Sequence, residues 1–115
     1  MSEKLNQSFC EACRQDAPVL TENEIQELAP EIPSWKIFKE KDIKKLICSF
    51  AFLNYKDSVE FANKVAILAE REDHHPEIIL EWGKVTVVWW SHKIMGLHKN
   101  DFICAAKTDE IYKAN

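Results

Sequence analysis

The chain has 115 residues, of which 46% are apolar, with only two glycines and four prolines. This length and composition are typical of one compact domain and exclude a disordered chain. The net charge of −4 gives no strong field that would favour a nucleic acid or an anionic membrane as a partner.

The first 20 residues form a polar segment that we interpret as an N-terminal arm, with the domain proper at residues 21–115. No apolar signal region or membrane-length apolar run is visible, so we expect a cytoplasmic protein. Its four cysteines are then expected to be reduced thiols. Cys10 and Cys13 have the spacing of half a zinc site, but a structural site needs four ligands, so a loosely docked arm is the favoured interpretation.

A capping box at Thr21-Glu-Asn-Glu24 predicts the start of a short helix, which Pro30 and Pro33 end. Alternating apolar and polar residues at 35–38 and 43–52 predict a hairpin. No glycine marks its turn. The lysines along this hairpin are interpreted as its solvated face rather than as a phosphate-binding surface: Lys36, Lys39, Lys41, Lys44 and Lys45.

The longest predicted helix begins after Asn54 as its cap and stops at about Asp73 or His74, because Pro76 holds His75 in an extended conformation. Two rows of apolar residues give this helix a broad face for packing. They are Tyr55, Val59, Ala62, Ala66 and Ala69 in one row and Phe61, Val65 and Leu68 in the other.

Residues 77–82 and 85–91 predict a second hairpin around Gly83, and residues 98–113 predict the last helix. The second strand carries a tryptophan on each face, so we expect helices on one face and a ligand or partner chain on the other. The predicted fold class is α+β: a four-stranded antiparallel sheet with helices on one face, in the order α-β-β-α-β-β-α.

The densest set of proton-handling groups is Glu70-Arg-Glu-Asp-His74-His75-Pro76, together with His92. Histidine gives and takes protons near neutral pH, so we expect His74, His75 and His92 to meet in one pocket. If the helix runs far enough, Glu70 lies one turn before His74 and can orient its ring. For His98, a surface or satisfied core role is favoured.

Other chemistries fit the residues less well. Adjacent side chains diverge on a helix or strand, so His74 and His75 are poorly placed to share a metal ion. The motifs H-E-x-x-H and G-x-S-x-G and a glycine-rich phosphate loop are all missing. General acid–base chemistry on a small molecule remains, in a pocket walled by aromatic residues such as Trp35, Trp82 or Trp90.

These residues closely resemble the signature of the pterin-4a-carbinolamine dehydratases. The resemblance covers about residues 21–113 and includes the Asn54 helix and the Gly96-Leu97 turn. Its signature is Glu70-x3-His74-His75-Pro76-x5-Trp82-x9-His92-x8-Asp101, preceded by Trp35. The Cys10-x-x-Cys13 segment is similar to the N-terminal extension of bacterial members.

The resemblance implies dehydration of 4a-hydroxytetrahydropterin to quinonoid dihydropterin, without a metal or organic cofactor. Such an enzyme recycles the pterin of aromatic amino acid hydroxylation. By position, the resemblance makes His74 and His92 the main proton-transfer groups, and His75 a group that binds and orients the pterin. It does not distinguish the acid from the base.

Four further residues take supporting roles from the same resemblance. Glu70 and Asp73 would tune and hold the histidines, while Trp35 and Asp101 would help to shape the pocket. Members of the family form dimers that pair into tetramers, so we expect a homo-oligomer. The alternative is a non-catalytic, dehydratase-like binding module for a protein partner, in which the histidines are dispensable.

Overall fold

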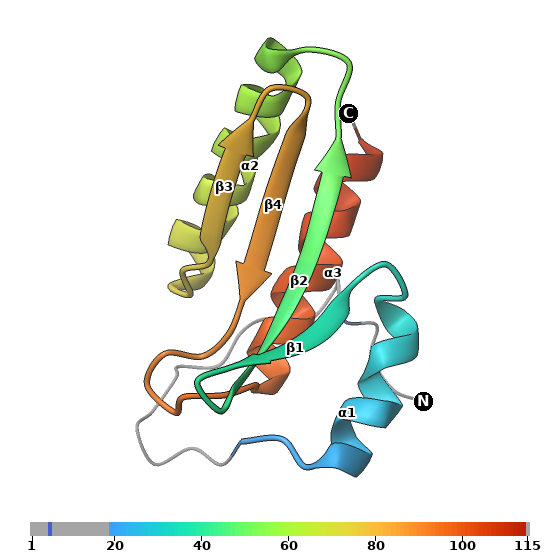
Figure 1. Cartoon of the computed structure of the whole chain (residues 1–115), viewed down its shortest axis with the longest axis vertical. Coiled ribbons are helices and arrows are strands. Elements are labelled where there is room, and N and C mark those ends of the chain that lie inside the picture. The colour runs from blue at the N-terminus through green and yellow to red at the C-terminus, as the bar shows by residue number, and fades with distance from the viewer. Residues whose placement is uncertain (1–4, 6–18, 115) are drawn as a thin grey trace.

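The computed structural model describes Leu5 and residues 19–114. These residues form α1 (Glu22–Leu28), β1 (Lys36–Glu40), β2 (Ile43–Ala51), α2 (Tyr55–Glu72), β3 (Glu77–Glu81), β4 (Lys84–Trp89) and α3 (Lys99–Lys113), shown in Figure 1. A short 3-10 helix, η2 (Ala29–Glu31), follows α1. The predicted α+β class and element order are confirmed. The Cys10-x-x-Cys13 segment lies outside the described residues.

The sheet is antiparallel throughout, with the strand order β1-β2-β4-β3. The two hairpins therefore lie side by side and are joined by β2 and β4, where Leu46 pairs with Trp89. Both are among the buried core side chains. The long central strands thus provide the platform on which the helices pack.

The turn of the first hairpin explains how two strands pair without a glycine. Lys41 and Asp42 both have left-handed backbone conformations, with φ of 51° and 64°. Two successive left-handed residues are the geometry of a type I′ turn, whose twist matches that of the flanking strands. This two-residue turn sets the register in which Glu40 pairs with Ile43.

Helices α2 and α3 cover one face of the sheet, and α1 lies beside the first hairpin (Figure 1). The core between them contains Leu46, Phe50, Phe61, Val65, Val87, Trp89 and Phe102. No helix in the described part of the chain is long and apolar enough to cross a membrane.

The buried side of α2 is narrower than predicted. Phe61, Val65 and Leu68 are buried as expected, but Tyr55 is 49% exposed and Ala66 is also exposed. A helix on the surface of a domain needs only a stripe of about 100° against the core, which one of the two predicted rows largely supplies.

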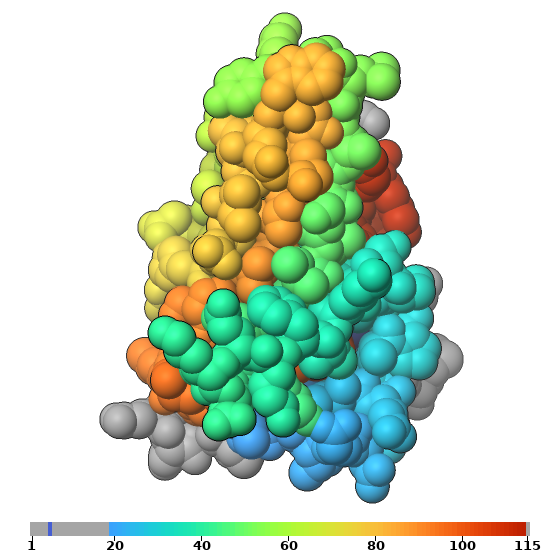
Figure 2. Space-filling view, in the orientation of Figure 1, coloured from blue at the N-terminus to red at the C-terminus, as the bar shows by residue number. Residues whose placement is uncertain are grey.

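None of the helices in the described residues covers the opposite face of the sheet, and Figure 2 looks onto this face. Ile79 is 43% exposed there, and Trp82, at the β3–β4 turn, is 72% exposed. The expectation that all the hairpin lysines are solvated is wrong for Lys45, which is 8% exposed. Its Nζ lies 2.6 Å from Oε1 of Glu40.

Candidate active site

The site begins where α2 ends. Asp73 adopts a left-handed conformation (φ 51°, ψ 43°), and its backbone N–H donates to the carbonyls of Ala69 and Glu70. Aspartate is among the few residues that tolerate this conformation, which often ends a helix. The chain turns here, so His74 becomes buried (5% exposed) while His75 is exposed.

This turn overturns the predicted pairing of Glu70 with His74. The helix does not continue to His74, and the Oε1 of Glu70 instead lies 2.6 Å from Nε2 of His75. Both side chains are well exposed, at 81% and 56%. Solvent therefore competes with this contact, which holds the His75 ring only weakly.

His74 is held from two sides in the interior. Its ring stacks on Trp89 of β4, with 5.5 Å between the ring centroids and 7° between the ring planes. Its Nε2 lies 2.6 Å from Oδ1 of Asp101, which is fully buried in the first turn of α3. This imidazole therefore has little freedom to rotate.

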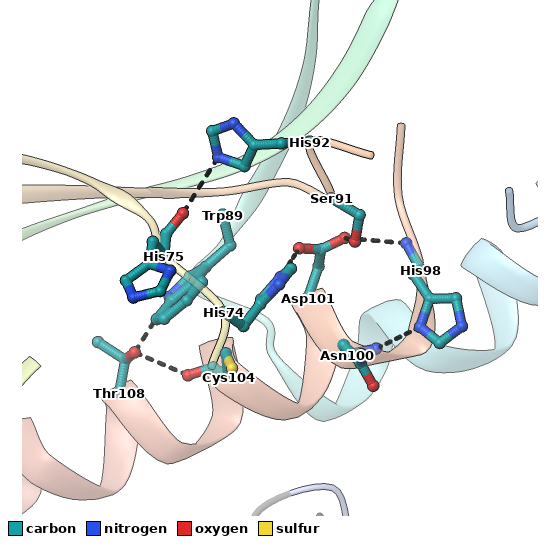
Figure 3. Close-up of polar contacts among 10 residues, drawn as sticks. All are labelled: His74, His75, Trp89, Ser91, His92, His98, Asn100, Asp101, Cys104 and Thr108. Atoms are coloured by element: carbon teal, nitrogen blue, oxygen red, sulfur yellow. Dashed lines mark hydrogen bonds and ion pairs between the residues drawn. The ribbon is translucent and has the colours of Figure 1, made fainter. Parts of the chain in front are cut away.

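Asp101 connects His74 to the loop after β4. Its Oδ2 accepts hydrogen bonds from Oγ of Ser91 (2.9 Å) and from the backbone N–H of His98 (2.9 Å), as Figure 3 shows. His98 is the N-cap of α3, and its Nδ1 accepts from the N–H of Asn100. One buried carboxylate thus accepts hydrogen bonds from three donors.

His92 lies in the loop between β4 and α3. This loop is closed by Ser91 and Gly96, whose backbone N–H groups each donate to the carbonyl of the other (2.9 and 3.3 Å). The His92 ring stacks on Trp90, with centroids 4.2 Å apart, and its Nε2 lies 3.1 Å from the carbonyl oxygen of His75. The exposed His92 ring therefore contacts both Trp90 and the segment between α2 and β3.

The three histidines share one feature of chemical importance. In each ring, Nε2 faces an oxygen: a carboxylate for His74 and His75, and a carbonyl for His92. Ionised carboxylates and carbonyls only accept hydrogen bonds, so Nε2 carries the hydrogen in each case. The neutral rings therefore keep a lone pair on Nδ1, which is the atom that can take a proton.

The structure brings Glu70, His74, His75, His92 and Asp101 together, with Asp73 at the turn between them. Trp35 and Trp82 lie apart from this set. The indole N–H of Trp35 donates to Oδ1 of Asp109 (2.9 Å), and its ring packs in the core 5.9 Å from that of Phe50. Trp82 lies at the opposite end of β3 from His75 (Figure 1).

Two residues of the site, Trp89 and Ser91, were not predicted from the sequence. The hydrogen bond from the His98 backbone to Asp101 was not predicted either. The alternation placed Trp89 on one face of its strand without saying which face is buried, and its stacking on His74 depends on the turn at Asp73. Ser91 precedes His92 and carried no signal of its own. Among the residues described, no three His, Cys, Asp or Glu side chains are arranged to hold a metal ion.

A small α+β domain with a buried His–Asp pair beside two further histidines defines a class of proteins equipped for proton transfer. The family model described as pterin 4 alpha carbinolamine dehydratase matches residues 18–111. The chain therefore belongs to this family, as its sequence motif predicted.

The similar proteins include bacterial relatives over nearly the full chain. A protein of Nitrosococcus oceani is 52% identical over 96% of this chain and 98% of its own length. One of Photobacterium profundum is 55% identical over 91% and 94%. The names of both give pterin-4-alpha-carbinolamine dehydratase as a provisional function.

A solved structure supports the fold. The crystal structure of a transcriptional coactivator/pterin dehydratase from Brucella melitensis matches with a TM-score of 0.74 and 28% identity. The match covers 83% of this chain and 99% of that one. The four-stranded sheet and its helices are thus shared with a pterin dehydratase.

Proposed function

We propose that this protein is a pterin-4a-carbinolamine dehydratase, a hydro-lyase that converts 4a-hydroxytetrahydropterin to quinonoid dihydropterin. The C4a–O bond breaks and the hydroxyl leaves as water after it receives a proton. The N5–H bond breaks, and its electrons form the N5=C4a double bond. One proton is supplied and one is removed, so the reaction needs an acid and a base but no net proton.

The observation that carries this proposal is the joined set of histidines in a chain of this family. His74 is held on Asp101, and His92 is held on the carbonyl of His75. Each ring has its Nδ1 as the atom available for proton exchange. We assign the two proton transfers to His74 and His92, in either order.

The remaining residues of the proposal bind or orient. His75 is exposed beside His92 and would contact the pterin, with Glu70 holding its ring. Asp101 fixes the catalytic ring of His74, and Asp73 supports the site through the turn that separates His74 from His75. The contacts of Trp35 lie in the core, so its predicted place in the pterin pocket receives no support from them.

The proposal also covers the metabolic role and the oligomeric state of the protein. The reaction would recycle the pterin of an aromatic amino acid hydroxylase in the cytoplasm. We further propose a homo-oligomer, dimer or tetramer, that covers exposed apolar side chains such as Ile79 and Trp82. Sedimentation equilibrium of the purified protein measures this state directly, and a monomer at all concentrations would contradict it.

The experiment for the activity follows the ultraviolet decay of enzymatically generated 4a-hydroxytetrahydropterin. We expect the wild type to accelerate this decay and His74→Ala and His92→Ala each to lose about 10²–10⁴ in rate, the scale of a lost proton-transfer group. His74→Gln and His92→Gln preserve more of the side-chain volume and guard against unfolding at the buried position.

The outcome separates the two candidate functions. Fast wild-type decay that both folded glutamine variants slow establishes the dehydratase and its proton-transfer pair. Wild-type decay no faster than in buffer would reject the enzyme and favour the binding module for a protein partner. Circular dichroism of each variant provides the control for folding.

A further inference from the structure

Trp90 and His92 form a stacked pair on the exposed side of the site. Trp90 follows the last residue of β4 and is half-buried. The two ring planes are inclined by 29°, and the centroids are 4.2 Å apart. This contact restricts rotation about χ2 of His92, a torsion that is otherwise broad.

Lys45 lies against the same tryptophan. Its Nζ is 4.0 Å from the centroid of the Trp90 ring, within the range of a cation–π interaction. The strand pairing explains the contact. Leu46 pairs with Trp89 in the antiparallel register, so Lys45, which precedes Leu46, lies across from Trp90, which follows Trp89. The ammonium also contacts Glu40 Oε1 at 2.6 Å, which holds it in place.

The burial of this lysine calls for a reason. Lys45 is 8% exposed, whereas its neighbours Lys39 and Lys41 on the same hairpin are exposed. Lysine is almost never fully buried unless it is paired, and burying its flexible stem costs side-chain entropy. The buried ammonium lies against Trp90, and Trp90 in turn contacts His92. The position of Lys45 can therefore affect the position of the His92 ring.

The hydrogen bond to His75 would hold His92 weakly by itself. It is 3.1 Å long and lies at an exposed position where water competes for both groups. The net contribution of such a hydrogen bond in water is too small to keep a surface ring in one orientation. The aromatic stack supplies the second contact, and two contacts determine which nitrogen faces the carbonyl.

We propose that Trp90 and Lys45 are positioning residues for His92. Lys45 holds the Trp90 ring, and Trp90 holds the His92 ring with Nε2–H on the carbonyl of His75 and Nδ1 free for the substrate. This inference rests on the proposed dehydratase function for its catalytic meaning. Its structural part, the fixed tautomer and orientation of His92, is independent of that function.

The test measures the His92 tautomer and the dehydratase kinetics in parallel. Four substitutions separate the contacts: Trp90→Phe keeps a ring, Trp90→Leu keeps only apolar bulk, Lys45→Arg keeps the cation and Lys45→Met keeps only the stem. The tautomer is read from ¹⁵N shifts of the imidazole at alkaline pH, where the ring is neutral, with His92→Gln to assign the signals. Tyr55→Leu is the matched control, since Tyr55 lies at the other end of α2.

For Trp90→Leu we expect a mixture of His92 tautomers and a fall of about 10-fold in kcat, with KM changed less than about 3-fold, because a misplaced catalytic group slows the reaction more than it weakens binding. Lys45→Met shifts both readouts in the same direction by a smaller amount. Trp90→Phe, Lys45→Arg and Tyr55→Leu retain the wild-type tautomer.

A folded Trp90→Leu protein with the wild-type tautomer and kcat would overturn the proposal. If Trp90→Leu does not fold, the pair Lys45→Met and Lys45→Arg decides: identical tautomer populations in these two variants also overturn it. If the wild type has no dehydratase activity, the proposed function fails, but the tautomer measurement still decides the positioning of His92.

Discussion

The carboxylate of Asp101 is the functional group on which the geometry of the site depends most. It accepts from His74, 27 residues earlier in the chain, and from Ser91 and His98 on the other side. Both of its oxygens accept hydrogen bonds inside the protein, where water cannot easily replace a lost partner. A change at Asp101 therefore affects two segments of the chain together.

Asp101→Asn is expected to destabilise the protein. A carboxamide has one acceptor oxygen and no charge. If this oxygen keeps the hydrogen bonds from Ser91 and His98, the NH₂ group faces Nε2 of His74, so His74 loses its charged acceptor and must change to the other tautomer. This costs about 1–3 kcal/mol of unfolding free energy, measurable by urea denaturation. Asp73→Asn is the matched control at an exposed turn, where asparagine tolerates the left-handed conformation equally well. Equal stability of Asp101→Asn and wild type would contradict the role of the carboxylate.

Asp109 predicts a pH dependence of stability. Burial raises the pKa of its carboxyl above the ordinary value of 3.8, against the opposing effects of the Trp35 hydrogen bond and the Lys113 charge. The folded state therefore holds this proton more tightly than the unfolded state. The contribution to stability is fully present below the unfolded pKa and is lost as pH rises through the folded pKa.

Asp109→Asn removes this titration and keeps an oxygen acceptor for Trp35. We expect this variant to be at least as stable as wild type at neutral pH. As the pH falls toward 4, we expect its free energy of unfolding to decrease relative to that of wild type. Asp109→Ala instead leaves the indole N–H unpaired and should cost about 1–3 kcal/mol. Urea denaturation across this pH range measures the stability of both variants, and a gain in stability of Asp109→Asn relative to wild type as the pH is lowered would show the sign to be wrong.

At the level of single residues, the sequence predicted that the three histidines meet but not which carboxylate pairs with which ring. Two histidines before a proline, followed by a third, indicated proton transfer because few other residues can perform it. The partner of His74 was misassigned to Glu70, because the local i,i+4 rule assumes a helix that Asp73 ends. The true partner, Asp101, meets His74 only through the packing of α2 and α3.

Helices and strands were predicted well because their signals are local. Capping at Thr21 and Asn54, the alternation in both hairpins and the stop before Pro76 all lie within a few residues of the boundaries they set. The signal that ends β4 is not local. The predicted strand reached Ser91, but β4 ends at Trp89, since Ser91 pairs with Gly96 to close the loop.

That loop is supported by the chain just before α1. Leu20 donates its backbone N–H to the carbonyl of Leu97 (2.9 Å), and a Cβ on Gly96 would lie 2.8 Å from Cγ1 of Val19. The loop that carries His92 is therefore packed directly against residues 19–20. The conformation of Gly96 itself is not left-handed, so contact with Val19 is the reason for a glycine here.

Gly96→Ala is expected to destabilise the protein by about 1–2 kcal/mol through overpacking against Val19. Val19→Ala in the same chain should restore most of this loss, because it removes the contacting atom. Gly83→Ala is the control: Gly83 has φ of +71°, so its cost is a matter of backbone conformation that Val19→Ala cannot relieve. Thermal unfolding of the three single variants and of the two double variants that contain Val19→Ala measures the coupling, and simple additivity of Val19→Ala and Gly96→Ala would refute the contact.

At the scale of the whole molecule, one sheet face and two helices enclose the core, and two thiols lie inside it. Cys48 and Cys104 are both buried, and both are reduced thiols. Burial, with the nearby charge of Asp109, raises the pKa of the Cys48 thiol to about 11, so it is protonated at neutral pH. Thiolates are the reactive form, so both shielding and protonation protect this side chain.

In a Cys10→Ser/Cys13→Ser background, we expect almost no reaction of the native protein with a disulfide reagent such as DTNB at neutral pH. Both remaining thiols should react in denaturant, and slow native labelling should follow the unfolding rate, since only opening of the core exposes them. Rapid labelling of the folded protein, well ahead of unfolding, would mean that the core around Cys48 opens locally.

The shared use of Asp101 has a consequence for how the site opens. The end of α2, the loop after β4 and the first turn of α3 are tied to one carboxylate, so none of them can detach without leaving a buried charge or donor behind. Amide protons in these three segments should then exchange with solvent through one common opening event, as a single cooperative unit. The arrangement of the proposed site is thereby either fully formed or lost as a whole, and partly assembled forms stay rare.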